Sequence, residues 1–224
     1  MSSSPRERSE RRARLGRARL YFVTDLLPGY ERVVRAALEG GAAMVQLRDK
    51  QASDEEILGA MAALRPLCDE HGALLWLNDR PDLALEAQAD GIHVGQQDVP
   101  VAEVRRLVGP GVLIGLSTHS PEQLEAALRS EADELSVGPV YATPTKEGRP
   151  AAGLGYVRHA ARVADPGRPW FAIGGIDLDN VHDVVDAGAQ RIVVVRAIRD
   201  ADDPRAAAAA LRAALDRRAV GAAW

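Results

Sequence analysis

The 224-residue chain contains few cysteine, lysine and aromatic residues and has no long apolar run. Its single cysteine, Cys68, excludes a disulfide framework and any metal site built from several thiolates. No apolar stretch approaches the ~18 residues of a transmembrane helix, and the first residues lack the apolar core of a signal peptide. We therefore expect a cytoplasmic protein without membrane spans.

Positive charge is concentrated at the start of the chain. Residues 1–19 contain seven arginines and two glutamates, which leaves 30 acidic and 21 basic residues in the remainder. Proteins that bind nucleic acid usually carry a basic surface on the folded body, so this acidic body argues against such a partner. Because the arginine-rich start has few apolar residues, residues 1–17 are predicted to form a disordered basic tail that is dispensable for chemistry.

Short apolar or β-branched runs alternate with longer amphipathic segments along the chain. Strands are predicted at residues 20–24, 43–47, 73–77, 91–94, 113–117, 134–137, 170–173 and 191–195. A helix is predicted after each strand, at residues 30–39, 54–70, 81–87, 101–108, 121–130, 156–163, 179–187 and 204–218. Eight strand–helix units favour an α/β fold, a single (β/α)8 TIM barrel over residues 18–224. An open, doubly wound sheet is the alternative, but the first strand is not followed by the glycine fingerprint of dinucleotide folds.

The only two lysines of the chain, Lys50 and Lys146, follow predicted strands at the end where barrel enzymes place their active sites. Arg48 and Lys50 are separated by one residue, so both positive groups leave the second strand on one side. A cationic cluster in an acidic protein is suited to binding phosphate. The sequence therefore predicts an anion site that contains Arg48, Lys50 and Lys146.

Two carboxylates, Asp79 and Asp98, lie after the third and fourth predicted strands, with asparagine and glutamine amides nearby. Few carboxylates combined with substrate phosphates are the usual arrangement for Mg²⁺, which prefers oxygen ligands. The alternative is that each aspartate caps the helix that follows it. The chain has no His, Cys and Glu spacing that is typical of zinc sites.

A second anion site is predicted at the ends of the last two strands. Gly174 and Gly175 follow the seventh strand, and Val195 and Arg196 end the eighth. Barrels frequently bind a phosphate at these two loops through backbone N–H groups, and glycine permits the close approach. Two anion sites, one of them assisted by a metal, imply a pair of substrates that carry a diphosphate and a monophosphate.

Six ordered motifs between Tyr21 and Ile198 resemble those of the thiamine-phosphate synthase family. The motifs are Gln46-Leu-Arg-Asp-Lys50, Asn78-Asp79, Gly91-Ile-His-Val-Gly-Gln-Gln-Asp98, Gly115-Leu-Ser-Thr-His119, Gly138-Pro-Val-Tyr-Ala-Thr-Pro-Thr-Lys146 and Ile173-Gly-Gly-Ile176. The resemblance implies a (β/α)8 barrel and a transferase of thiamine biosynthesis. Such an enzyme condenses a hydroxymethylpyrimidine diphosphate with a thiazole phosphate in the presence of Mg²⁺ and releases thiamine phosphate and pyrophosphate.

The resemblance also implies roles for individual residues. The catalytic groups would be Arg48, Lys50, Ser117 and Lys146, and Mg²⁺ would be bound by Asp79 and Asp98. The pyrimidine diphosphate would be held by Gln46, Leu47, Arg48, Asp49, Lys50, Asn78, Ser117 and Lys146. The thiazole phosphate would be held by Thr143, Pro144, Thr145, Gly175, Val195 and Arg196. The family often has Ser at the position of Arg196, and Phe-Pro at the positions of Tyr141 and Ala142.

Two other functions are compatible with these residues. A thiazole tautomerase of the same family would use His119 for proton transfer and would not need the complete diphosphate and metal set. A non-catalytic barrel that binds a phosphorylated metabolite is the alternative from another functional class. The roles of His93 and His119 in a synthase stay open, with contact to the pyrimidine as one alternative for His93. A homo-oligomer is compatible with the sequence.

Overall fold

The computed structural model describes residues 5–143, 150–165 and 167–221. Eight parallel strands pair in sequence order and close into a barrel, because β1 pairs with both β2 and β8. The strands are β1 (Leu20–Thr24), β2 (Met44–Leu47), β3 (Leu74–Asn78), β4 (Gly91–Val94), β5 (Leu113–Thr118), β6 (Glu134–Val137), β7 (Trp170–Ile173) and β8 (Ile192–Val194). The predicted TIM barrel is confirmed.

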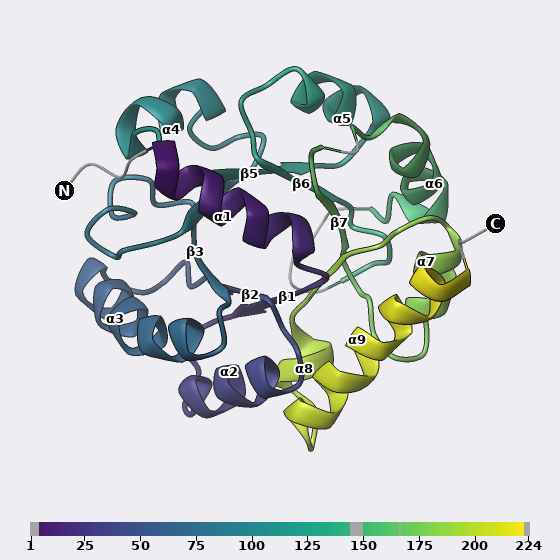
Figure 1. The fold of residues 1–224 in the computed structure, drawn as a ribbon, viewed down its shortest axis with the longest axis horizontal. Helices are drawn as coiled ribbons and strands as arrows, with labels where there is room; N and C mark the ends of the chain where they lie inside the picture. Colours follow the sequence, from purple (N-terminus) through teal and green to yellow (C-terminus); the bar gives the residue numbers. More distant parts are fainter. Residues whose placement is uncertain (1–4, 144–149, 166, 222–224) are drawn as a thin grey trace.

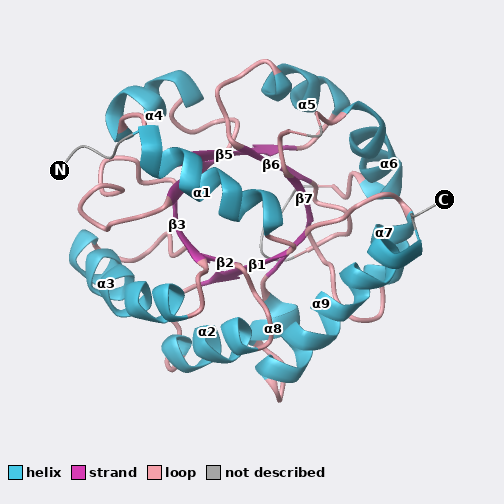
Figure 2. Cartoon of the chain, in the orientation of Figure 1, coloured by secondary structure: helices cyan, strands magenta, loops and turns pink. Residues whose placement is uncertain are grey.

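Helices surround the ring of strands, as Figure 2 shows. They are α2 (Tyr30–Glu39), α3 (Asp54–Glu70), α4 (Val101–Val108), α5 (Pro121–Leu128), α6 (Gly153–Val163), α7 (Val181–Asp186), α8 (Arg196–Arg199) and α9 (Pro204–Gly221). Several helices begin where the sequence supplies a cap. At α3, for example, the Ser53 side chain accepts the N–H of Glu56, and the Glu56 carboxylate accepts the N–H of Ser53.

One predicted helix, at residues 81–87, is wrong, because residues 81–88 form turns between β3 and β4. The N–H of Leu83 bonds to the carbonyl of Arg80 only three residues back, and Gln88 adopts a left-handed φ of 51°. The segment therefore turns before a regular helix can propagate.

Among the described residues, no helix is long and apolar enough to cross a membrane.

Successive side chains of each strand point to opposite faces of the sheet, and this produces two separate apolar cores, one outside the barrel and one inside it. Side chains that point outward, such as Phe22, Val45 and Ile114, pack against the helices. Side chains that point inward fill the barrel near the amino ends of the strands, where the Tyr21 and Phe171 rings meet edge to face at 5.6 Å. This packing closes one end of the barrel and leaves room for a ligand toward the carboxyl ends.

The arginine-rich start of the chain forms a helix, which corrects the prediction of a disordered tail for residues 5–17; residues 1–4 lie outside the described part. Helix α1 (Pro5–Arg17) lies across the amino ends of the strands, in front of the barrel in Figure 1. Leu15 is 1% exposed and joins the inward-facing core. Leu15 thus anchors α1 to the inward-facing core, although the low apolar content of residues 5–17 predicts no such packing.

Buried aspartates at the amino ends of the strands hold the arginines of α1. Arg8 and Arg12 donate to Oδ1 of Asp133 at 2.9 and 2.6 Å, and Arg11 donates to Oδ1 of Asp90 at 2.9 Å. Both carboxylates are buried. Because a buried charge is costly without charged or hydrogen-bonding partners, these contacts bind α1 to the barrel.

Candidate active site

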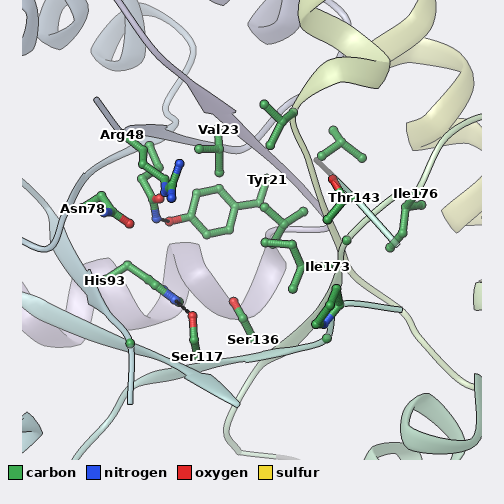
Figure 3. A pocket seen from close by; sticks show the side chains of 18 of the residues that line it. Tyr21, Val23, Arg48, Asn78, His93, Ser117, Ser136, Thr143, Ile173 and Ile176 are labelled. Carbon is green, nitrogen blue, oxygen red and sulfur yellow. Dashed lines mark hydrogen bonds between the residues drawn. The ribbon is translucent and has the colours of Figure 1, made fainter. Parts of the chain in front are cut away.

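A cavity of about 630 Å³ opens at the carboxyl ends of the strands. In Figure 3, Arg48 and Asn78 lie on one side, Thr143 and Ile176 lie on the other, and the Tyr21 ring lies between them. The volume is within the range of small-molecule sites. The predicted site residues that line the cavity are Gln46, Arg48, Lys50, Asn78, Asp79, Asp98, Ser117, Thr143, Gly175, Val195 and Arg196.

The remaining predicted residues fall into two groups. Leu47 and Asp49 have side chains away from the cavity: Leu47 is buried in the helix-facing core, and Asp49 accepts the N–H groups of Leu26 and Gln51 at 3.3 and 3.0 Å. The alternation of side chains along β2 explains why Gln46 and Arg48 point inward while Leu47 does not. The residues that lie outside the described part are Pro144, Thr145 and Lys146.

One wall of the cavity carries the predicted charges. The Nζ of Lys50 lies 3.1 Å from Oδ2 of Asp79. Asp79 has a φ of 59°, which is uncommon for a residue other than glycine, and its N–H donates to the carbonyl of His93 at 2.9 Å. Such strained conformations cluster at functional sites and persist where the surroundings hold them.

Neither aspartate of the predicted metal pair caps a helix. Turns follow Asp79, and the residue before α4 is Pro100, which makes no side-chain capping bond. Asp98 instead accepts the N–H of Gly95 through Oδ2 at 2.7 Å, which ties it into the loop after β4. Two carboxylates on one cavity wall match the sparse oxygen donor set that Mg²⁺ uses together with substrate phosphates. In the described part of the chain, no group of three or more His, Cys, Asp or Glu side chains is suited to holding a metal.

A glycine-rich turn forms the opposite wall. Gly174 and Gly175 have φ values of 105° and 65°, which favour glycine. A Cβ at Gly174 would lie 2.5 Å from the Cα of Pro139, and one at Gly175 would lie 2.8 Å from the Cβ of Tyr141. The loops after β6 and β7 can therefore approach each other only with glycine at both positions. Arg196 is exposed at the edge of this wall.

Polar side chains also line the interior of the barrel beneath the cavity. The amide of Gln46 donates to the hydroxyl of Tyr21, so its carbonyl oxygen is directed elsewhere. Burial, and secondarily the negative charge of Glu134, raise the pKa of Tyr21, which keeps its phenol protonated. His93 joins Ser117 and Glu134 through its two ring nitrogens, at 2.9 and 3.0 Å.

Tyr21 and Glu134 were not among the site residues predicted from the sequence. A signal for Glu134 is present, because Glu134 and Ser136 occupy alternate positions of a short strand whose other residues are apolar. A polar pair spaced by two residues indicates the inward face of a strand that contributes to a polar site. His119 also lines the cavity, and its Nδ1 donates to the carbonyl of Gly138 at 2.6 Å.

Known proteins resemble this chain in both sequence and structure. A family model described as thiamine monophosphate synthase matches residues 20–198. The thiamine-phosphate synthase of Saccharopolyspora erythraea is 51% identical over 213 residues, which cover 91% of this chain and 96% of that protein. That of Nostoc sp. is 50% identical over 195 residues, which cover 87% of this chain and 55% of the relative, so the chain spans about half of that protein.

A solved structure of the same family also resembles this chain. Thiamine phosphate pyrophosphorylase from Pyrococcus furiosus superimposes with a TM-score of 0.83 and 34% identity, over 92% of this chain and 98% of that one. The match of the family model extends from the first strand to α8, and it therefore includes both walls of the cavity. The chain belongs to the thiamine monophosphate synthase family.

Proposed function

We propose that this chain condenses 4-amino-2-methyl-5-(diphosphooxymethyl)pyrimidine with 4-methyl-5-(2-phosphoethyl)thiazole to form thiamine phosphate and pyrophosphate. The observation that carries the proposal is a single cavity with a charged wall, at Arg48, Lys50, Asp79 and Asp98, and a glycine wall at Gly174 and Gly175. One cavity can hold two phosphorylated substrates face to face only if each end accepts an anion, and this cavity offers two such ends. The family relationship supports the same reaction.

The charged wall would hold the pyrimidine diphosphate. Arg48 supplies a planar group that can bind two phosphate oxygens at once, and Lys50 supplies a compact ammonium. Gln46 and Asn78 would orient the pyrimidine, with the Gln46 carbonyl oxygen directed by the bond from its amide to Tyr21. Asp79 and Asp98 would hold Mg²⁺, which when bound neutralises charge on the diphosphate oxygens.

The glycine wall would hold the thiazole phosphate. Backbone N–H groups near Gly175 and Val195 would bind this phosphate, since barrels frequently bind a phosphate at the loops after their last two strands. Thr143 lines the same end and would add a hydroxyl donor, as would Thr145 beyond the described residues. This arrangement would point the thiazole nitrogen at the exocyclic carbon of the pyrimidine.

The reaction breaks the bond between that exocyclic carbon and the diphosphate oxygen, and the electron pair leaves with pyrophosphate. The thiazole nitrogen then donates its lone pair to the carbon, which forms the new C–N bond and a positively charged thiazolium ring. No proton is removed in this step, so the chain needs no general base. Its residues act by alignment of the two rings and by stabilisation of the negative charge on the leaving group, with Arg48, Lys50, Ser117 and Lys146 as donors.

The decisive experiment incubates purified protein with both phosphorylated heterocycles and Mg²⁺ and measures thiamine phosphate and pyrophosphate in equal amounts. Reactions that omit either substrate or contain excess chelator are the controls. Binding of thiamine phosphate without turnover would indicate a metabolite-binding barrel and contradict the proposal. Isomerisation of the thiazole substrate alone would instead indicate a tautomerase.

A further inference from the structure

A buried glutamate lies behind the cavity wall. Glu134 on β6 is 0% exposed and points into the barrel. Its Oε2 lies 3.0 Å from Nδ1 of His93, and its Oε1 accepts the hydroxyl of Ser136 at 3.0 Å. A carboxylate that is fully removed from water is costly even with such partners, because its desolvation is only partly offset. The proposed reaction gives Glu134 no direct role.

His93 connects Glu134 to the cavity. Its Nε2 lies 2.9 Å from Oγ of Ser117, a contact that Figure 3 shows as a dashed line. A carboxylate oxygen accepts hydrogen bonds, so with Glu134 ionised the contact places a hydrogen on Nδ1 of His93 and fixes the orientation of the ring. Ser117 has a single hydroxyl hydrogen, so it can donate to a phosphate only when Nε2 of His93 supplies the hydrogen between the two side chains. In that arrangement His93 holds the oxygen of Ser117 in place and leaves the hydroxyl hydrogen available.

Gly115 makes room for this pair. A Cβ at Gly115 would overlap with both Oε2 of Glu134 and Nδ1 of His93. Gly115 is not among the residues with a positive φ, so the backbone does not require glycine there. The available space does, because the Glu134–His93 contact occupies the volume that a side chain at position 115 would need. Glycine at position 115 therefore leaves the space in which Glu134 and His93 meet.

We propose that Glu134 is a positioning residue, which fixes the His93 ring and through it holds the Ser117 hydroxyl against the departing pyrophosphate. This inference rests on the proposed function, which assigns Ser117 to the diphosphate. A free serine side chain rotates among three staggered positions, whereas a group that stabilises developing charge must be aligned before the reaction. Glu134 is not among the described residues that line the cavity, so its effect passes through His93.

A double-mutant cycle tests the inference. Glu134→Gln keeps the side-chain volume and removes the charge that orients His93. We expect kcat to fall about tenfold with the KM for the thiazole phosphate nearly unchanged, because alignment is lost and substrate binding is not. In a Ser117→Ala background the same substitution is expected to cost less than about twofold, because residues that act as one unit are not additive.

Glu125→Gln is the matched control. Glu125 lies 3.5 Å from His159 in another glutamate–histidine pair, outside the cavity, and its side chain is 54% exposed. Its kcat is expected to remain within about twofold of the parent. Effects of Glu134→Gln and Ser117→Ala that simply multiply would overturn the inference while thiamine phosphate still forms. Absence of turnover in the unsubstituted protein would instead contradict the proposed function.

A spectroscopic measurement needs neither substrate nor a folded variant. In protein labelled with ¹⁵N-histidine, we expect the His93 ring to carry hydrogens on both nitrogens, because Nδ1 donates to Glu134 and Nε2 donates to Ser117. A His93 ring with a hydrogen on only one nitrogen would overturn the inference whatever the kinetics show. Where Glu134→Gln folds, we expect His93 to lose one of its two ring hydrogens, because the neutral amide no longer supplies a negative charge beside the ring.

Discussion

The ammonium of Lys50 lies 3.1 Å from the carboxylate of Asp79, which joins the anion site to the candidate Mg²⁺ site. With a diphosphate present, Lys50 and Mg²⁺ would both neutralise its negative charge. Asp79→Asn is therefore expected to raise the Mg²⁺ concentration for half-maximal turnover at least ~10-fold, because an amide oxygen replaces a charged ligand. A Mg²⁺ titration of the initial rate measures this effect.

Asp82→Asn is the matched control for Asp79→Asn. Asp82 is three residues away and bonds to Arg80 at 2.7 Å, but it does not line the cavity in the described part of the chain. Its Mg²⁺ dependence is expected to match that of the parent. If the initial rate of Asp79→Asn depended on Mg²⁺ in the same way as that of the parent, Asp79 would not be a ligand of the metal.

Lys146 is one of only two lysines in the chain, and we predict that it stabilises the departing pyrophosphate. Lys146→Ala is expected to lower kcat at least ~10²-fold, the effect of losing one donor to a developing negative charge. Lys146→Arg is expected to recover part of this loss, because it restores the charge with a different shape. Single-turnover rates at saturating substrates measure both, and a parent-like rate for Lys146→Ala would contradict the role.

The barrel strands and both walls of the cavity were predictable from the sequence, because each depends on residues close together in the chain. Residues 134–137, for example, form a strand with the bounds that the alternating pattern predicts. Polar residues that follow such strands must meet at one rim, since all strands of the barrel are parallel. This is why Arg48, Asp79 and Gly175 could be assigned to a common site.

Features that depend on distant partners were not predictable. Helix α1 is held by Asp90 and Asp133, and the bonds from Arg11 and Arg12 to these aspartates span 79 and 121 residues. The contact between Glu134 and His93 spans 41 residues. The composition of residues 5–17 alone favours disorder, and only the folded barrel supplies the carboxylates that reverse this preference.

Cys68 is expected to be unreactive in the folded protein. Burial raises the pKa of its thiol to about 12, so almost no thiolate exists at pH 8. Iodoacetamide should therefore modify native protein far more slowly than protein unfolded in urea. Because the pKa is higher in the folded state than the ~8.5 of an exposed thiol, the folded state binds more protons between these two values. The free energy of unfolding should therefore fall as the pH rises through this range.

Helix α1 is expected to stabilise the barrel although it lies at the opposite end from the cavity. Leu15→Ala should lower the free energy of unfolding by about 2–5 kcal/mol, the usual cost of truncating a buried leucine. For a chain of this length that corresponds to a fall in Tm of roughly 4–20 °C. Arg17→Ala is the control in the same helix, because Arg17 is exposed, and its Tm should match that of the parent.

Removal of residues 1–17 is expected to destabilise the barrel, since it exposes the core beneath Leu15 and leaves Asp90 and Asp133 without the arginines of α1. Removal of one partner of a buried ion pair lowers the free energy of unfolding by about 3–5 kcal/mol. Arg65 still bonds to Asp90 and Arg105 to Asp133, at 2.9 and 3.0 Å, so this loss is partial. A chain that begins at Ala18 should melt well below the parent yet keep its kcat at temperatures where it remains folded. An unchanged Tm would show that α1 contributes nothing to stability, whereas a lower kcat in the folded state would show that it acts on the cavity.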